Sequence, residues 1–156
     1  MKIKVAKVFL IGFLVAFLVV LCSSGNYKDV SYEEFDAVFS EQESVKELKK
    51  SDRKMLLKLY ALDESDYEVS YLRYSSELMN VDELFIIKVF KEEQLKAVED
   101  SVNRRKSQQL SNFAGYGAEQ TELLSKSIIL TKGNYVFFGV SKDIEKWKEI
   151  FLKEIK

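Results

Sequence analysis

The chain has 156 residues and a formal net charge of −1, with one cysteine and neither histidine nor proline. Without histidine, Ser-His-Asp and Cys-His catalysis are excluded within one chain, and the commonest metal ligand is missing. A single cysteine forms no intramolecular disulfide and no thiolate metal cluster. The lack of proline argues against proline-rich linkers between domains.

The first 22 residues have the layout of a signal peptide or membrane anchor. Three lysines precede an uncharged apolar run over residues 8–22. Lysines before such a run stay on the cytoplasmic side, so the chain beyond it is translocated. We expect residues 1–22 to be a signal peptide or anchor, residues 23–29 a tether, and residues 30–156 a single extracytoplasmic domain.

Three fates of this leader are open. Cys22, followed by Ser23-Ser24-Gly25, resembles the lipidated cysteine of bacterial lipoproteins, although Leu21 replaces the usual small residue. Cleavage by an ordinary signal peptidase near Ser24 would give a secreted protein. An uncleaved leader would remain as an anchor, although its apolar run is short for a span of about 20 residues. We favour lipidation of Cys22, with the protein on the outer face of the plasma membrane.

The first part of the domain predicts two helices and two strands. Ser31 and Glu34 form a capping box, which predicts a helix beginning at that point. A second helix is expected over residues 51–60. Aromatic and branched side chains over residues 67–74 and 83–90 predict strands.

The second part repeats the order strand, strand, helix. Apolar residues at helical spacing predict a long helix over residues 91–113, and a short helix follows around residues 119–126. Gly133-Asn134 between two apolar runs predicts a tight hairpin, and a last helix is expected over residues 142–155. Two ββα units predict an α+β fold: a four-stranded antiparallel sheet with helices packed on one face, preceded by an N-terminal helical segment.

Carboxylates are the remaining candidates for catalysis or metal binding. Asp63, Glu64 and Asp66 crowd one turn but lack the spacing of an EF-hand, so we favour a solvated turn over a calcium site. Asp82 and Glu83 are neighbours in a strand, where their side chains point to opposite faces and cannot flank one bond. We therefore predict no metal and no cofactor.

One set of polar residues is a candidate ligand-binding site. Arg105 and Gln109 share one side of the long helix, and Tyr116, Glu119 and Gln120 follow just beyond its end. Such residues could form a pocket in which the arginine holds a carboxylate. We favour the alternative that Arg105 and Gln109 fasten the following loop through its carbonyl groups.

Short motifs along the chain resemble a family of uncharacterised lipoproteins from Gram-positive bacteria, known only as a domain of unknown function. They are Leu59-Tyr60-Ala61-Leu62-Asp63, Asp82-Glu83, Arg105…Gln109…Phe113…Tyr116…Glu119-Gln120, Lys132-Gly133-Asn134-Tyr135-Val136 and Val140-Ser141. Ala61 stands where the family usually has Gly, and Ala118 where it often has Pro. The resemblance implies a signal sequence, usually a lipid anchor, and an external domain, but no activity or substrate.

The resulting expectation is a membrane-attached, non-catalytic domain that binds a protein or another cell-envelope component. Nucleic acid is not expected, because the residues after the three leading lysines hold 21 basic and 25 acidic side chains. One alternative is a hydrolase of cell-wall glycan that uses two of Glu119, Asp82 and Asp63. Another is a small-ligand-binding or inhibitory lipoprotein that uses the Arg105 pocket.

Overall fold

The computed structural model describes residues 27–156. The predicted leader, including Cys22, and most of the predicted tether therefore lie outside the described residues. Within residues 27–156, no helix combines the length and the apolar character that a membrane span requires.

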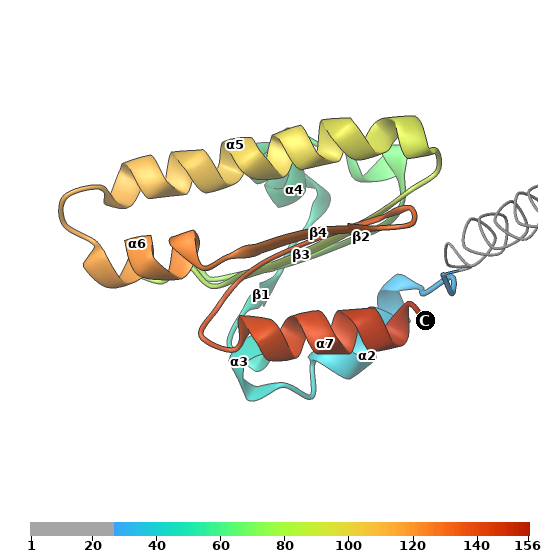
Figure 1. Ribbon diagram of the computed structural model, residues 1–156, viewed down its shortest axis with the longest axis horizontal. Helices are drawn as coiled ribbons and strands as arrows, with labels where there is room; N and C mark the ends of the chain where they lie inside the picture. Colours follow the sequence, from blue (N-terminus) through green and yellow to red (C-terminus); the bar gives the residue numbers. More distant parts are fainter. Residues whose placement is uncertain (1–26) are drawn as a thin grey trace, which may run out of the picture.

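A five-stranded antiparallel sheet runs through the centre of the described part (Figure 1). In spatial order its strands are β1 (Lys49–Lys50), β2 (Tyr67–Tyr74), β3 (Glu83–Val89), β5 (Tyr135–Val140) and β4 (Ile128–Lys132). The predicted α+β class and antiparallel sheet are confirmed, but the predicted number of four strands is wrong. The additional strand, β1, consists of two lysines, which is too short and too polar to produce a strand pattern in the sequence.

Helices cover both faces of this sheet, which corrects the prediction that they pack on one face (Figure 1). The first face carries α2 (Tyr32–Phe39), α3 (Glu43–Lys46) and α7 (Ile144–Glu154); the second carries α4 (Arg53–Tyr60), α5 (Leu95–Phe113) and α6 (Ala118–Ser125). Every residue of β3 and β5 is buried. Central strands that are apolar on both sides need a helical layer on each side to exclude water.

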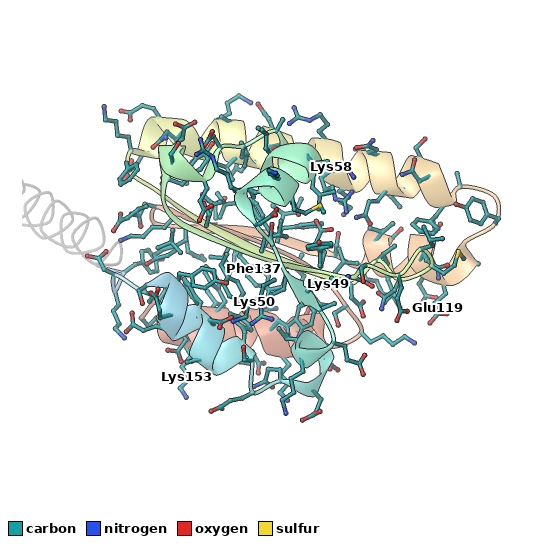
Figure 2. The ribbon with its side chains drawn as sticks, turned by 180° about the vertical axis from the view of Figure 1, so that it is seen from behind. Lys49, Lys50, Lys58, Glu119, Phe137 and Lys153 are labelled. Carbon is teal, nitrogen blue, oxygen red and sulfur yellow. The ribbon has the colours of Figure 1, made fainter. Side chains whose placement is uncertain are left out.

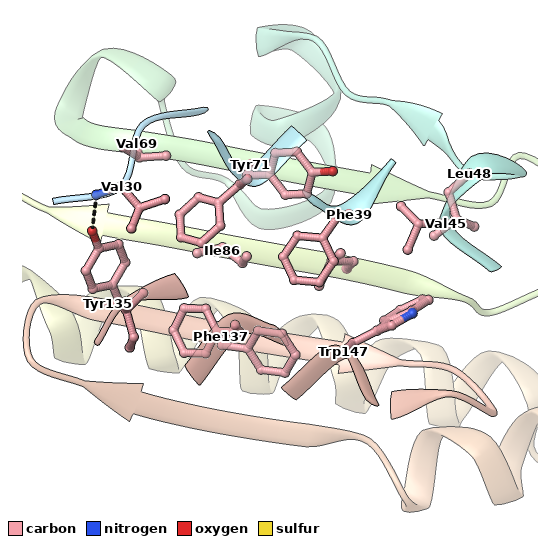
Figure 3. Close-up of a cluster of buried hydrophobic side chains, with 14 of the residues drawn as sticks. Val30, Phe39, Val45, Leu48, Val69, Tyr71, Ile86, Tyr135, Phe137 and Trp147 are labelled. Carbon is pink, nitrogen blue, oxygen red and sulfur yellow. Dashed lines mark hydrogen bonds between the residues drawn. The ribbon is translucent and has the colours of Figure 1, made fainter. Parts of the chain in front are cut away.

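The core layer between the sheet and the helices α2 and α7 is rich in aromatic rings (Figure 3). Phe137 of β5 stacks on Phe151 of α7 with ring centroids 5.0 Å apart, and Tyr71 of β2 stacks on Phe39 of α2 at 5.9 Å. Such pairs add about 0.5–1.5 kcal/mol each to the hydrophobic gain from burial. These aromatic side chains are therefore core residues and do not form an exposed platform.

Local signals in the sequence account for most element boundaries. The predicted capping box is present, because Ser31 Oγ accepts from the Glu34 amide at 3.2 Å and the Glu34 carboxylate accepts from the Ser31 amide at 2.8 Å. The hairpin between β4 and β5 turns at Gly133, whose φ of +54° is costly for other residues. The predicted starts of α4 and α7 are two residues early, and the largest departure is at α5, which was expected from residue 91 but begins at Leu95, after a single 3₁₀ turn over Glu92–Gln94.

The segment that leads into the domain is held firmly at one end of the sheet. The Tyr135 hydroxyl accepts a hydrogen bond from the Val30 amide and donates one to the Lys28 carbonyl, both at 2.9 Å. The Lys28 amide donates to the Ile155 carbonyl at 2.8 Å. The first described residues and the C-terminus therefore lie side by side (Figure 1).

Candidate functional site

The structure joins Arg105 and Gln109 to a buried carboxylate that the sequence had not linked to them. Glu83, at the start of β3, is only 2% exposed. The Arg105 Nε and Nη2 atoms donate to its two carboxylate oxygens at 3.2 and 2.6 Å, and Gln109 Nε2 donates at 3.3 Å. The guanidinium fork therefore already holds a carboxylate of the chain itself. This corrects the expectation that both side chains fasten the loop carbonyls.

Tyr60, at the end of α4, completes this cluster by donating its hydroxyl proton to Glu83. Burial of the phenol and the negative charge of Glu83 raise the pKa of Tyr60 well above its usual value. Burial by itself would lower the pKa of Arg105, but the hydrogen bonds and charge of Glu83 outweigh it, so the pKa of Arg105 is raised. The cluster links α4, α5 and β3, and the raised pKa values keep the Tyr60 phenol neutral and the Arg105 guanidinium charged near neutral pH.

The other three predicted site residues lie elsewhere, around the loops at the far end of α5. Tyr116 is 67% exposed. The Glu119 carboxylate pairs with Lys142 at 2.7 Å, and Gln120 Nε2 donates to the Met79 carbonyl at 2.7 Å. The predicted set is thus divided, with two residues beneath α5 and three at this end of the molecule.

Glu119 and Gln120 line a pocket of about 420 Å³ together with Asp82. Burial raises the pKa of Asp82, although Lys142 acts against it, and no described residue donates a hydrogen bond to Asp82 Oδ1. Asp63, the third carboxylate of the hydrolase hypothesis, does not line this pocket. It is held by Arg53 at 2.7 Å, which lowers its pKa.

A second concavity, which the sequence did not predict, lies along the outer edge of β2. Its volume is about 920 Å³. One wall is residues 29–34 at the start of α2, the opposite wall includes residues 51–53 at the start of α4, and the floor is the first part of β2. Figure 2 looks onto this edge, with α2 below the sheet and α4 above it. We call it the acidic groove. It is lined by six acidic and two basic residues, Asp29, Glu33, Glu34, Asp52, Glu64, Glu68, Arg53 and Lys88.

The edge of β2 is exposed in this groove because β1 is so short. β1 pairs only with Tyr74 and Arg73. Over residues 67–71, β2 has β3 on its inner side and no strand among the described residues on its outer side. Whether an edge of a strand is covered depends on which other strands lie beside it. The sequence of β2 alone therefore could not predict that its outer edge is exposed.

Residues 41–141 match the sequence profile of a family described as a domain of unknown function, DUF4358. The chain belongs to the DUF4358 family. No curated protein and no solved structure matches it. The predicted membership of a family of unknown function is thereby confirmed, whereas the lipid anchor and the Gram-positive source stay predictions.

The DUF4358 region contains all five strands and the helices α3 to α6, while α2 and α7 lie outside it. The floor of the acidic groove and its α4 wall therefore belong to the family region. The α2 wall is formed by residues that precede this region.

Proposed function

We propose that this DUF4358 protein is a non-catalytic domain, attached through its N-terminus to the outer face of the plasma membrane, that binds an envelope protein through the acidic groove. The observation that carries the proposal is the open edge of β2 inside a groove of about 920 Å³. Exposed edges are usually covered or blocked because they invite pairing with other chains. An exposed sheet edge can bind an extended segment of another protein as an added strand.

The position of the groove supports a partner near the membrane. Asp29 lies in its wall, and the neighbouring residues Lys28 and Val30 are fastened to Tyr135. The groove therefore opens beside the point where the chain arrives from the predicted anchor. A partner bound there would be held close to the lipid surface.

The most deeply buried charged clusters of the described part are satisfied within the domain itself. The most deeply buried charges, those of Glu83 and Lys88, are each paired with side chains of the domain itself. Within residues 27–156, no three His, Cys, Asp or Glu side chains are grouped so that they could hold a metal ion.

Photo-crosslinking on intact cells tests the proposal. A benzoylphenylalanine at Glu33, in the groove, should give a discrete crosslinked product, while the same residue at Gln108, on the exposed side of α5, should not. Equal products from both positions, or none from Glu33, would overturn the proposal. A C-terminal tag on the same protein should be cleaved by protease added outside the cells, since an inaccessible tag would refute the proposed location.

A second candidate function rests on the pocket shared by Asp82 and Glu119. A carboxyl group whose pKa is raised by burial, near a second carboxylate, is the arrangement that glycoside hydrolases use. Purified protein would then release soluble fragments from bacterial cell-wall glycan, and D82N would abolish the release. The release can be followed as loss of turbidity of a cell-wall suspension. If the suspension stays equally turbid with and without the wild-type protein, this function is wrong.

A further inference from the structure

We propose that the acidic groove takes up an extended, lysine- or arginine-rich peptide segment of its partner, which adds to the sheet as a strand alongside β2. This inference rests on the proposed function and specifies the chemistry of the partner. It follows from four features of the groove: the orientation of the edge, an unsatisfied hydroxyl, the length of the open edge, and its charge.

The hydrogen-bonding groups of the open edge point into the groove. The Leu72 carbonyl accepts from the Ser51 amide at 3.0 Å, so the polar backbone groups of Leu72 face outward, away from β3. In a strand, the outward-facing residues alternate. The amide and carbonyl of Ser70 therefore also face the groove, where β1 no longer reaches.

The side chain of Ser70 adds a second unsatisfied group. Its hydroxyl oxygen is buried and has no hydrogen-bond partner among the described residues, and Ser70 lines the groove. A buried hydroxyl without a partner costs about 1–3 kcal/mol relative to one that is bonded. A rotation of the Ser70 side chain toward the groove would let the hydroxyl bond to a peptide group of a bound strand.

The open edge has the length of a short peptide. It covers residues 67–71, with an irregularity between Tyr67 and Val69 where the pairing with β3 shifts by one residue. At about 3.4 Å per residue, these five residues span roughly 17 Å. A partner segment of about five to seven residues would fill the space between α2 and α4.

The charge of the groove selects a basic segment. Six acidic residues face two basic ones, a formal balance of −4. The N-termini of α2 and α4 lie in the walls and contribute about half a positive charge each, which leaves the groove clearly negative. A basic strand would be attracted to it.

The same charge disfavours the other possible occupants. A second copy of the chain that paired through β2 would bring two acidic grooves together across a two-fold axis. The first 26 residues of the chain have their three lysines ahead of an apolar run and contain no alternating basic strand. A separate basic partner is therefore the occupant that the groove fits best.

Hydrogen exchange on the full chain in non-ionic detergent tests the inference. The probe is a capped seven-residue peptide of alternating lysine and valine. The matched controls are its glutamate–valine counterpart and a lysine–valine peptide N-methylated at every residue, which has no backbone amide to donate at either edge. We expect the basic peptide to slow exchange in residues 67–72 and neither control to do so. Protection by the N-methylated peptide would show binding by charge alone and overturn strand addition.

Charge reversal in the walls of the acidic groove provides a second test of the inference. Glu33 and Glu64 are exposed, and both line the groove. E33K/E64K should weaken binding of the basic peptide about tenfold, while E41K/E93K, which changes the net charge equally outside the groove, should leave the affinity within about twofold. Equal weakening by both pairs would contradict a role of the groove.

Two outcomes separate this inference from the proposed function. Crosslinks from Glu33 on cells, without protection of residues 67–72 by the basic peptide, would leave the binding function standing and refute strand addition. Protection of the outward-facing Ser70 amide before any peptide is added would mean that a second copy or residues 1–26 already occupy the edge, and would also refute it. Loss of the crosslinks as well would remove the proposed function itself.

Discussion

Arg105→Ala should destabilise the domain strongly, because it leaves the Glu83 carboxylate buried without its cation. The pair is bidentate, and the two side chains are 16% and 2% exposed. Solvent therefore screens the interaction little. Removing one member of such a pair typically costs about 3–5 kcal/mol.

The structure narrows this range. In the variant, Tyr60 and Gln109 still donate hydrogen bonds to Glu83, which offsets part of the loss. Protonation offers another route, since neutralising an ordinary glutamate at pH 7 costs about 3.7 kcal/mol and sets a ceiling on the charge contribution. We expect a loss of about 3 kcal/mol, which lowers the melting temperature by roughly 10 °C for a domain of this size.

Urea unfolding followed by circular dichroism measures this loss. Arg104→Ala is the matched control, because Arg104 precedes Arg105 on α5 and donates only to the Tyr60 carbonyl and the Ser101 hydroxyl. It should cost about 1 kcal/mol. Adding E83Q to the Arg105→Ala variant should recover stability, since it removes the unpaired charge. If Arg105→Ala costs no more than the control and E83Q recovers nothing, the buried-charge reasoning is wrong.

Three further outcomes follow from the described residues. Ala61→Gly should stabilise the domain by about 1 kcal/mol in the same urea assay, because Ala61 ends α4 with a φ of +56°; Ala37→Gly, inside α2, should instead destabilise by a similar amount. D82N should raise the free energy of unfolding at pH 7 and give no gain below pH 3.8, because burial raises the pKa of Asp82 and the folded state therefore resists its ionisation; a gain that persists in acid would contradict this. Stability should fall above pH 10, because burial raises the pKa values of Tyr60 and Tyr71, and the last phenolate absorbance should appear together with unfolding; titration of all eight phenols at the ordinary pKa in a folded protein would exclude it.

The sequence predicted those features that depend on neighbouring residues. The capping box at Ser31, the hairpin at Gly133 and the strands β2 to β5 are each specified by a few consecutive side chains. The two positions at which the resemblance leads us to expect another residue also have a structural explanation. Ala61 occupies a left-handed position that suits glycine, and Ala118 is the first residue of α6, where proline is favoured.

Features that depend on distant residues could not be predicted in this way. Arg105 and Glu83 are 22 positions apart, and nothing in the spacing on α5 indicates which strand the arginine faces. The apolar character of β3 and β5 is consistent with helices on both faces of the sheet. It does not specify which helices pack on which face, because that depends on contacts between distant residues. The acidic groove exists only because β1 stops after two residues beside the longer β2.

One network of ion pairs joins the acidic groove to residues 27–30, the segment that leads into the domain. The proposed binding site is therefore coupled to the point at which the domain is attached. Lys88 is 2% exposed, and its ammonium group contacts Asp29 at 2.6 Å and also Glu68. Asp29 belongs to the incoming segment and is largely exposed, whereas Glu68 lies on the edge strand. A basic strand in the groove would offer both carboxylates a second cation without displacing the buried lysine. Because the buried lysine cannot move far, the bound peptide and the first residues of the domain would be fixed relative to each other.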